Sequence, residues 1–293
     1  MKLKKTMTAL AACILSATTW AAPGTFSTFE SSGANPVEIT ASRDAFRAAI
    51  GGGTVAGANG SFGGQRFEIN WDGVPDNRSD SNALPGNFFN VNSPRGALFK
   101  TPGTGFLVSA KAGLSTPTLF GFANDFQTFS PQRLFTAVNS NITDVTFFVP
   151  GTTTAATTSA FGAVFVDVEV ANQTKIEFFD ANGALIYGHD ALVAGNQGLS
   201  FLGAISSDGA RISRVRLTSG LNTIVSNGVL GNLNDDVVVM DDFLYAAPIS
   251  AVPEPSSIAL LGAGLAVIGS MRRRSLRRSQ GDCASGLGGQ IQA

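Results

Sequence analysis

Aspartates in two stretches of the sequence have the type and spacing expected of cation ligands. Asp72, Asp76 and Asp80 recur every four residues in a stretch that contains Gly and Pro, and Asp235 and Asp241 flank an apolar segment. Hard cations such as Ca²⁺ are bound by several oxygen ligands on flexible loops. These five aspartates are therefore the candidate calcium ligands. The alternative is that they are solvated turn residues that cap local backbone groups.

Three glutamates lie in segments that alternate apolar and polar residues, as strands do, and these are Glu68, Glu169 and Glu177. Glycoside hydrolases act with two carboxyl groups that flank the scissile bond. Two of these glutamates could form such a pair across a cleft. The alternative is that each faces solvent, where Glu177 can pair with Lys175.

An aromatic group close to the first aspartate stretch could bind sugar rings. Trp71 precedes Asp72, and Phe88 and Phe89 follow in the same region. Trp71 could stack against a sugar, whereas large aromatic side chains are more often part of the core. Both interpretations of Trp71 stay open at this point.

The sequence offers little for nucleophilic or metal-dependent catalysis. A Ser-His-Asp or Cys-His system needs a histidine, and the single one, His189, lies in a loop-like Tyr-Gly-His-Asp stretch. Cys13 and Cys283 lie in the two end segments, so the centre has no thiolate metal site and no disulfide. Gly51–Ala56 fits Gly-X-Gly-X-X-Ala, but no helix pattern follows it, which indicates a loop. We predict no catalytic residues and a protein that is not an enzyme.

The composition indicates strands joined by tight turns. Hydrophobic residues make up 44% and charged residues 14% of the chain, with 34 Gly and with 22 Phe against 4 Met. Eight of the 20 basic and two of the 21 acidic residues lie in the end segments, which leaves residues 23–250 with a net charge of −7. An acidic domain repels phosphate backbones, so nucleic acid is not an expected partner.

Alternating and β-branched or aromatic patterns predict about a dozen strands. Turn sequences such as Asp180–Gly183 separate them. The predicted strands are Arg66–Trp71, Ala97–Lys100, Phe106–Ala110, Thr118–Phe122, Arg133–Val138, Asp144–Val149, Phe161–Val170, Lys175–Phe179, Ala184–Tyr187, Ser200–Ile205, Ile212–Thr218 and Val237–Ala246.

One short helix is expected over residues 42–50. Ser42 can cap it, Phe46 gives it an apolar face, and Gly51–Gly53 ends it. A dozen strands in the 23–250 domain predict an all-β fold, a two-sheet antiparallel β-sandwich that is jelly-roll-like.

Residues 1–22 form a predicted secretory signal peptide. Lys2, Lys4 and Lys5 precede an apolar stretch, and small residues near Ala21 offer a cleavage site for signal peptidase. One alternative is an uncleaved membrane anchor, and another is a lipoprotein signal that ends at Cys13.

The 251–275 segment has three physically distinct parts, and a polar tail follows over 276–293. A stiff, extended proline-flanked sequence comes first. An apolar segment over 256–271 predicts a short transmembrane helix in the inner membrane, although it is shorter than a usual span. A cationic stop then holds its end on the cytoplasmic side. The first part is Pro253, Glu254 and Pro255, and the stop is Arg272, Arg273 and Arg274.

This segment resembles the PEP-CTERM sorting signal of Gram-negative bacteria over residues 252–274. The resemblance implies that an exosortase, a membrane-bound cysteine protease-transpeptidase, recognises the Pro-Glu-Pro sequence and removes the tail. It also implies a producer of exopolysaccharide and biofilm. In this sequence the chain continues past the arginines as a Gly-rich extension.

We therefore expect an exported cell-surface or extracellular-matrix protein that is anchored only transiently in the inner membrane. Signal peptidase and exosortase are its expected partners during export, and exopolysaccharide is its expected partner afterwards. The domain would be a non-catalytic adhesive, structural or polysaccharide-binding module. The alternative is a secreted carbohydrate-active enzyme, a glycanase or lyase, on the same β-sandwich.

Overall fold

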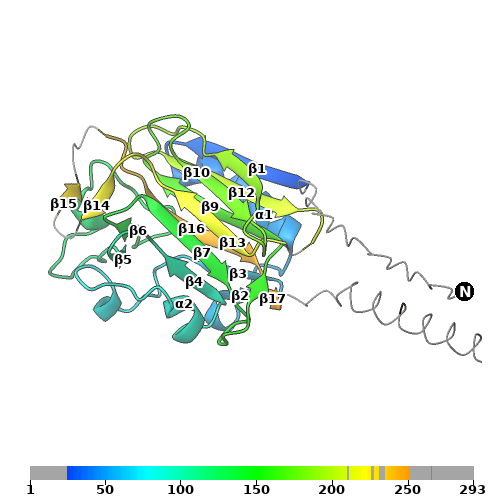
Figure 1. Cartoon of the computed structure of the whole chain (residues 1–293). Helices are drawn as coiled ribbons and strands as arrows, with labels where there is room; N and C mark the ends of the chain where they lie inside the picture. Colours follow the sequence, from blue (N-terminus) through cyan, green and yellow to red (C-terminus); the bar gives the residue numbers. More distant parts are fainter. Residues whose placement is uncertain (1–24, 210, 226–227, 231–234, 251–264, 266–293) are drawn as a thin grey trace, which may run out of the picture. The chain divides into compact units, whose positions relative to one another are not determined.

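The computed structural model describes residues 25–209, 211–225, 228–230, 235–250 and 265 (Figure 1). The chain divides into two units, residues 1–250 and residues 251–293. The predicted signal peptide, the Pro-Glu-Pro sequence, the arginine cluster and the polar tail lie outside the described residues, as does nearly all of the predicted transmembrane helix. None of the described helices combines the length and the apolar character needed to cross a bilayer.

Ten strands form the larger sheet, in the order β1-β12-β9-β16-β6-β14-β15, with β3 beside β16, β2 beside β3 and β5 beside β6. Its pairs are antiparallel except for one parallel bridge between β14 and β6. The strands are β1 Phe26–Gly33, β2 Ser61–Phe62, β3 Arg66–Ile69, β5 Gly105–Val108, β6 Phe135–Val138, β9 Ala160–Val166, β12 Leu199–Ser206, β14 Thr223–Val225, β15 Gly228–Leu230 and β16 Val239–Ala246.

Five antiparallel strands form the smaller sheet, in the order β11-β10-β13-β7-β4, and a separate pair joins β8 to β17. These strands are β4 Ala97–Lys100, β7 Ile142–Phe147, β8 Ala156–Thr157, β10 Lys175–Phe179, β11 Leu185–Asp190, β13 Arg214–Thr218 and β17 Ile249–Ser250. The helices are α1 Pro36–Ile50 and α2 Phe88–Val91, with 3₁₀ turns η1 Ala58–Gly60, η2 Asp76–Arg78 and η3 Leu119–Gly121.

Aromatic side chains fill the space between the two sheets. Phe147 on β7 lies 6.4 Å from Phe161 on β9 and 5.5 Å from Tyr245 on β16, measured between ring centroids. Trp71 stacks on Phe135 at 4.0 Å. Because alternate residues of each strand point into this layer, the period-two pattern of the sequence becomes one shared core. The predicted all-β fold of antiparallel sheets is confirmed, and its finer jelly-roll assignment stays a prediction.

Helix α1 begins six residues before the predicted helix over 42–50 and has 15 residues. It begins at Pro36, because Asn35 caps it by accepting a hydrogen bond from the Val37 N–H at 3.1 Å. Ser42, the predicted cap, lies inside the helix and donates to the Glu30 carbonyl. The helix ends where predicted, at Gly51, whose φ of +95° favours glycine.

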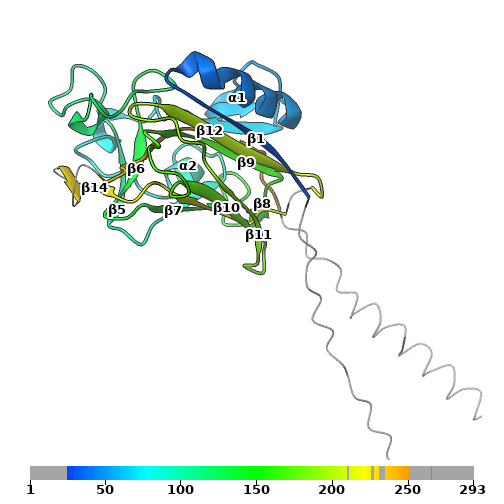
Figure 2. The same ribbon diagram turned by 90° about the horizontal axis from the view of Figure 1, so that it is seen from above.

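Helix α1 forms a third layer on the outer face of the larger sheet (Figure 2). Phe46 lies over Gly162 on β9 and Gly203 on β12, which are partners in the strand register. A Cβ atom built on Gly203 would lie 3.0 Å from the Phe46 ring. The two glycines therefore form a flat surface against which the helix packs.

Most predicted strands are confirmed, with Ala97–Lys100 and Lys175–Phe179 at their predicted bounds. The predicted strand at Thr118–Phe122 is wrong, since η3 turns the chain there and both Leu119 and Phe120 have positive φ. The edge strand β1 was missed because its Phe26 and Phe29 are three residues apart, which breaks the alternation.

Replacing Gly203 with Ala is expected to lower the free energy of unfolding by about 1–3 kcal/mol, since the added methyl meets Phe46. Gly73→Ala is the matched control, because a Cβ there has open space around it, and it should change stability by less than about 0.5 kcal/mol. Chemical denaturation of both variants checks this. Equal stability of the two variants would contradict the proposed packing of Phe46 against Gly203.

Candidate functional site

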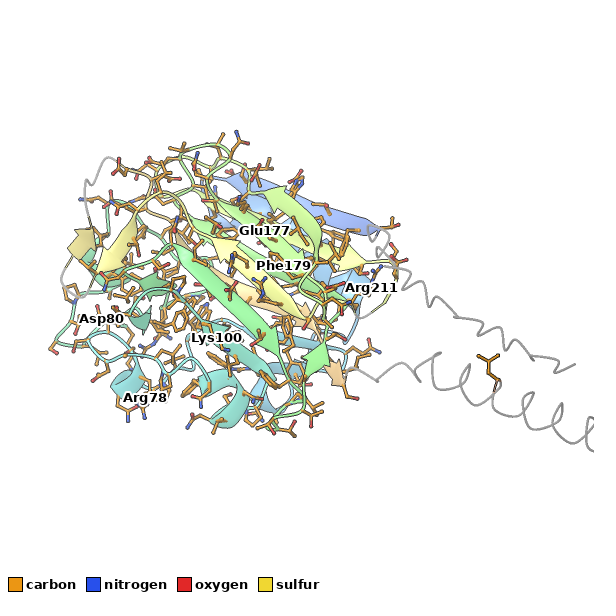
Figure 3. The ribbon with its side chains drawn as sticks, viewed as in Figure 1. Arg78, Asp80, Lys100, Glu177, Phe179 and Arg211 are labelled. Carbon is orange, nitrogen blue, oxygen red and sulfur yellow. The ribbon has the colours of Figure 1, made fainter. Side chains whose placement is uncertain are left out.

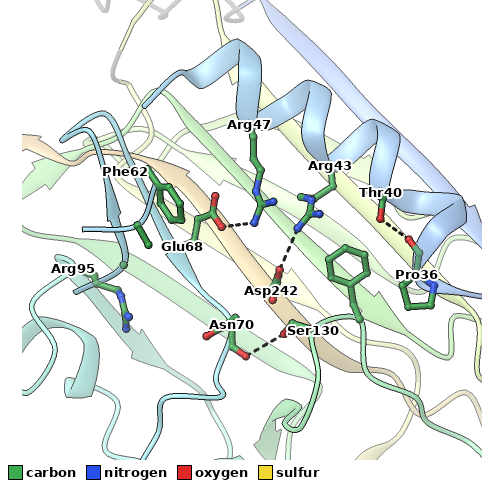
Figure 4. Close-up of a pocket in the computed structure, with 13 residues that line it drawn as sticks. Pro36, Thr40, Arg43, Arg47, Phe62, Glu68, Asn70, Arg95, Ser130 and Asp242 are labelled. Carbon is green, nitrogen blue, oxygen red and sulfur yellow. Dashed lines mark hydrogen bonds and ion pairs between the residues drawn. The ribbon is translucent and has the colours of Figure 1, made fainter. Parts of the chain in front are cut away.

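A polar pocket of about 480 Å³ lies between α1 and the outer face of the larger sheet (Figure 4). Its walls come from five separate segments: α1, the stretch from residue 56 to 70, Arg95, the loop at 129–130 and strand β16. The lining side chains include three arginines, two carboxylates and two phenylalanines. A small number of charged groups converging on one concave site is typical of ligand-binding pockets.

A β-bulge in β16 supplies the carboxylate at the floor of the pocket. Met240 pairs with Phe165 and Phe243 pairs with Ala163, so β16 carries one residue more than β9 over this step. Met240 and Phe243 both point into the core between the sheets. Because of the bulge, the side chains of the intervening residues, Asp241 and Asp242, do not follow the usual alternation between the two faces of the sheet.

Asp241 is fully buried and holds the 129–130 loop in place. Its Oδ2 accepts hydrogen bonds from the N–H groups of Phe129 at 2.6 Å and Ser130 at 3.2 Å, and its Oδ1 accepts the Ser130 hydroxyl at 2.9 Å. The Asp241 carbonyl accepts the Trp71 Nε1–H at 2.9 Å. Burial, followed by the charge of Asp242, raises the pKa of Asp241 well above its usual range.

Asp242 lines the pocket with only 4% of its surface exposed. Its Oδ2 lies 3.7 Å from Nη1 of Arg43, and its Oδ1 has no hydrogen-bond partner among the described residues. Burial raises the pKa of this carboxyl group. A buried oxygen without a partner is costly, and a hydrogen bond to this atom would remove that cost.

A network of arginines ties α1 to β3. Glu68 on β3 accepts from Nη2 of Arg47 with one oxygen and from Nε of Arg66 at 2.6 Å with the other. Arg66 also donates to the carbonyls of Arg47 at 3.2 Å and Gly53 at 2.9 Å. A cation at the C-terminal end of a helix interacts favourably with its carbonyl groups, so this network fixes the wall of the pocket.

Arg95 closes the opposite side of the pocket. Its Nε donates to the Asn59 carbonyl at 2.6 Å, and its guanidinium lies 4.8 Å from the centroid of the Phe89 ring. Burial lowers the pKa of Arg95. No carboxylate in the described part of the chain forms an ion pair with it.

Two further hollows adjoin the pocket. One, of about 630 Å³, shares Arg47 and Phe62 with it, and the other, of about 250 Å³, shares Asn70 and Arg95. Because shared side chains form the boundaries, the three hollows follow one another along the surface. This arrangement suits an extended ligand better than a single small molecule.

The five predicted calcium ligands are spread over the domain and mostly have other partners. Asp72 accepts the Arg133 N–H at 3.2 Å, and burial raises its pKa to about 6. Asp76 forms ion pairs with Lys111 and Arg133, which lower its pKa. Asp80 is half-buried.

Asp235 is exposed, and Asp241 is bound to the 129–130 loop. Across the described ranges no group of three His, Cys, Asp or Glu side chains lies close enough to hold a metal ion. The structure therefore does not bring the five aspartates together, and calcium binding stays a prediction.

Trp71 is a core residue in the structure, with 1% of its surface exposed. It borders the smallest hollow, yet it stacks on Phe135 and lies edge-on to Phe89, so no face is open to a sugar ring. The stacking role predicted for Trp71 is thus corrected, and its core interpretation is the one that fits.

The three predicted glutamates are not brought together as a catalytic pair. Glu68 lines the pocket, whereas Glu177 lies on the outer face of the smaller sheet near Phe179, in register with Arg216 (Figure 3). Glu169 follows β9, where its N–H donates to Asp236. The residue that does join Glu68 in the pocket is Asp242.

The sequence patterns missed the arginines of the pocket. Arg43 and Arg47 lie four residues apart on one face of α1, a spacing that was already available within the predicted helix over 42–50. Arg95 carries no local signal, because only the fold brings it next to β3 and β16.

Replacing Asp242 with Asn is expected to raise the free energy of unfolding at pH 8. Because the folded-state pKa of Asp242 is raised, stability linked to this group is complete at acid pH and is lost as pH rises through the raised value. The advantage of the variant should therefore shrink toward pH 4. Urea denaturation of both proteins between pH 4 and 8 measures it, and a variant that is less stable at pH 8 would contradict the prediction.

The comparison with known protein families concerns the C-terminal segment of the chain. No curated protein matches the sequence. A family model described as the PEP-CTERM protein-sorting motif matches residues 251–274, which include the predicted Pro-Glu-Pro sequence and the arginines at 272–274. This match confirms the resemblance drawn from those residues. The chain therefore carries a PEP-CTERM protein-sorting motif and is an exported protein sorted by an exosortase.

Proposed function

We propose that the protein acts at the cell surface or in the extracellular matrix, where its β-sandwich binds polysaccharide without cleaving it. The sorting motif implies export and transit of the membrane. The observation that carries the binding proposal is the row of three adjoining hollows, which runs from α1 past β3 to α2. A polymer needs successive subsites, and such a row supplies them.

The chemistry of the central pocket fits sugar hydroxyl groups. Arginine and amide N–H groups donate hydrogen bonds, and the free Oδ1 of Asp242 accepts them. The rings of Phe62 and Phe129 add apolar surface beside these polar groups. Sugar rings offer donors, acceptors and C–H faces together, so each kind of lining group has a counterpart on the ligand.

Binding without cleavage is favoured by the state of Glu68. Both of its carboxylate oxygens are held by guanidinium groups, one by Arg47 and one by Arg66. Both oxygens of Glu68 are therefore already occupied by hydrogen bonds within the protein. The pocket therefore positions a ligand more readily than it attacks one.

The alternative, a carbohydrate-active enzyme, rests on one specific observation. Glu68 and Asp242 line the same pocket, and burial raises the pKa of Asp242, which is the environment of a general acid. An enzyme of this kind would release new reducing ends from the polysaccharide it binds.

Filling the pocket should abolish polysaccharide retention. Ala56 is exposed and lines the pocket, so Ala56→Trp would occupy it without removing a charge. We expect at least a tenfold weaker retention on the polysaccharide of the producing organism. Val55→Trp is the matched control, because Val55 is 82% exposed and does not line the pocket.

Retention and release of reducing ends are measured in the same assay. Equal retention of both variants would overturn the assignment of the pocket. If the native protein is not retained, the binding proposal fails, and the protein is a structural matrix component without a specific ligand. Cleavage that Asp242→Asn removes would establish the enzyme instead.

Replacing Pro253, Glu254 and Pro255 with alanine should block processing of the sorting segment. In a host that has the exosortase, the native protein recovered from the surface should lack the 272–274 arginines, and the variant should retain them. Intact-mass spectrometry distinguishes the two. Replacement of Ser256 and Ser257 with alanine is the neighbouring control. The processing proposal is wrong if the native protein recovered from the surface still contains these arginines.

A further inference from the structure

Arg95 differs from the other arginines of the pocket in having no acidic partner. Arg43 pairs with Asp44 and Asp242, and Arg47 pairs with Asp44 and Glu68. Within the described residues Arg95 makes no ion pair, and its two Nη groups make no hydrogen bond. A partly buried guanidinium without a counter-ion is a ready site for a carboxylate, which it can grip with two parallel N–H bonds.

The surroundings hold Arg95 in one orientation. The Asn59 carbonyl fixes Nε and the Phe89 ring supports the plane of the guanidinium. A Cβ atom on Gly60 would lie 2.7 Å from Arg95 Nε and 2.9 Å from Nη2, so only glycine leaves room for it there. The φ of Gly60, +64°, favours glycine as well. The arginine is thus positioned in advance of any ligand.

Asp242 presents a complementary group in the same pocket. Its side chain is buried, and its Oδ1, which has no partner among the described residues, can accept a hydrogen bond from a hydroxyl group. The charged lining residues are three arginines and two carboxylates, an excess of one positive charge. The surrounding 23–250 domain has a net charge of −7, so the pocket is a cationic spot in an acidic domain.

We propose that this pocket recognises a uronic acid unit of an acidic polysaccharide, with the sugar carboxylate on Arg95 and a ring hydroxyl on Asp242. This inference rests on the proposed function and narrows its ligand to one class. A neutral sugar could use Asp242 but would leave Arg95 without its counter-ion. A small anion alone would use Arg95 but would leave Oδ1 of Asp242 without a donor.

The test compares two ligands that differ only in charge. An oligogalacturonate is measured against the same oligomer after its carboxylates have been reduced to primary alcohols, by calorimetry with the full-length protein. We expect the acidic oligomer to bind at least tenfold more tightly. Free acetate, as an anion without hydroxyls, should bind at least a hundredfold more weakly than the acidic oligomer.

Arg95→Gln should remove the preference, so that the two oligomers bind about equally. Arg78→Gln is the matched control, since Arg78 is exposed, makes no ion pair with described residues and lies outside the pocket. Arg95→Lys keeps a positive charge but loses the planar fork, and it should keep part of the preference. Thermal unfolding of each variant shows whether it is folded. If Arg95→Gln does not fold, the preference measured with Arg95→Lys decides the test.

Equal binding of the two oligomers by the native protein, or an unchanged preference in Arg95→Gln, would overturn the inference. If the native protein is nevertheless retained on the native polysaccharide and the Ala56→Trp variant is not, the proposed function still holds. If neither oligomer binds and retention is also absent, both proposals fail.

Discussion

The contact between Phe46 and the paired glycines of β9 and β12 determines where α1 lies, and the pocket depends on that helix. Phe46 rests on Gly162 and Gly203, where no side chain stands between ring and sheet. The ring also packs edge-on against Phe201 at 5.6 Å. Arg43 and Arg47 project from this helix toward β16 and β3 (Figure 4). A packing contact in an apolar layer thereby sets the geometry of a polar site.

The buried charges of the domain are tolerated because most of them are tied to specific partners. Arg66 and Arg133 are almost fully buried, and each donates to a carboxylate and to at least one backbone carbonyl. Desolvation of such groups is costly unless hydrogen bonds replace the lost water. Asp242 and Arg95 both line the central pocket, and among the described residues neither Oδ1 of Asp242 nor the two Nη groups of Arg95 have a hydrogen-bond partner.

The sequence predicted the parts of the fold that depend on local pattern. Alternation located β10 and β4 at their bounds, and the run of glycines located the end of α1. It failed at Thr118–Phe122, where an apolar run with β-propensity covers the outer core as a turn instead of a strand. Local propensity cannot tell these cases apart, since packing decides between them.

The candidate site was less predictable than the fold. Its residues come from five segments between Pro36 and Asp242, and no motif links them. Asp242 lay in a predicted strand, where its direction depended on a bulge that the alternation did not reveal. Trp71 drew attention by its type, although its environment is the core. The sorting motif, in contrast, could be recognised from the sequence because all of its parts are contiguous in the chain.

The register of the larger sheet has a consequence for when this chain can fold. Phe26 on β1 pairs with Ser206, and Arg66 on β3 pairs with Ala246, so both pairings span 180 residues. Such distant pairings make folding slow. A polypeptide threaded through a narrow translocation channel from its N-terminus cannot complete this sheet until nearly the whole domain has emerged. The larger sheet therefore closes only after passage, when β12 and β16 become available to β1 and β3.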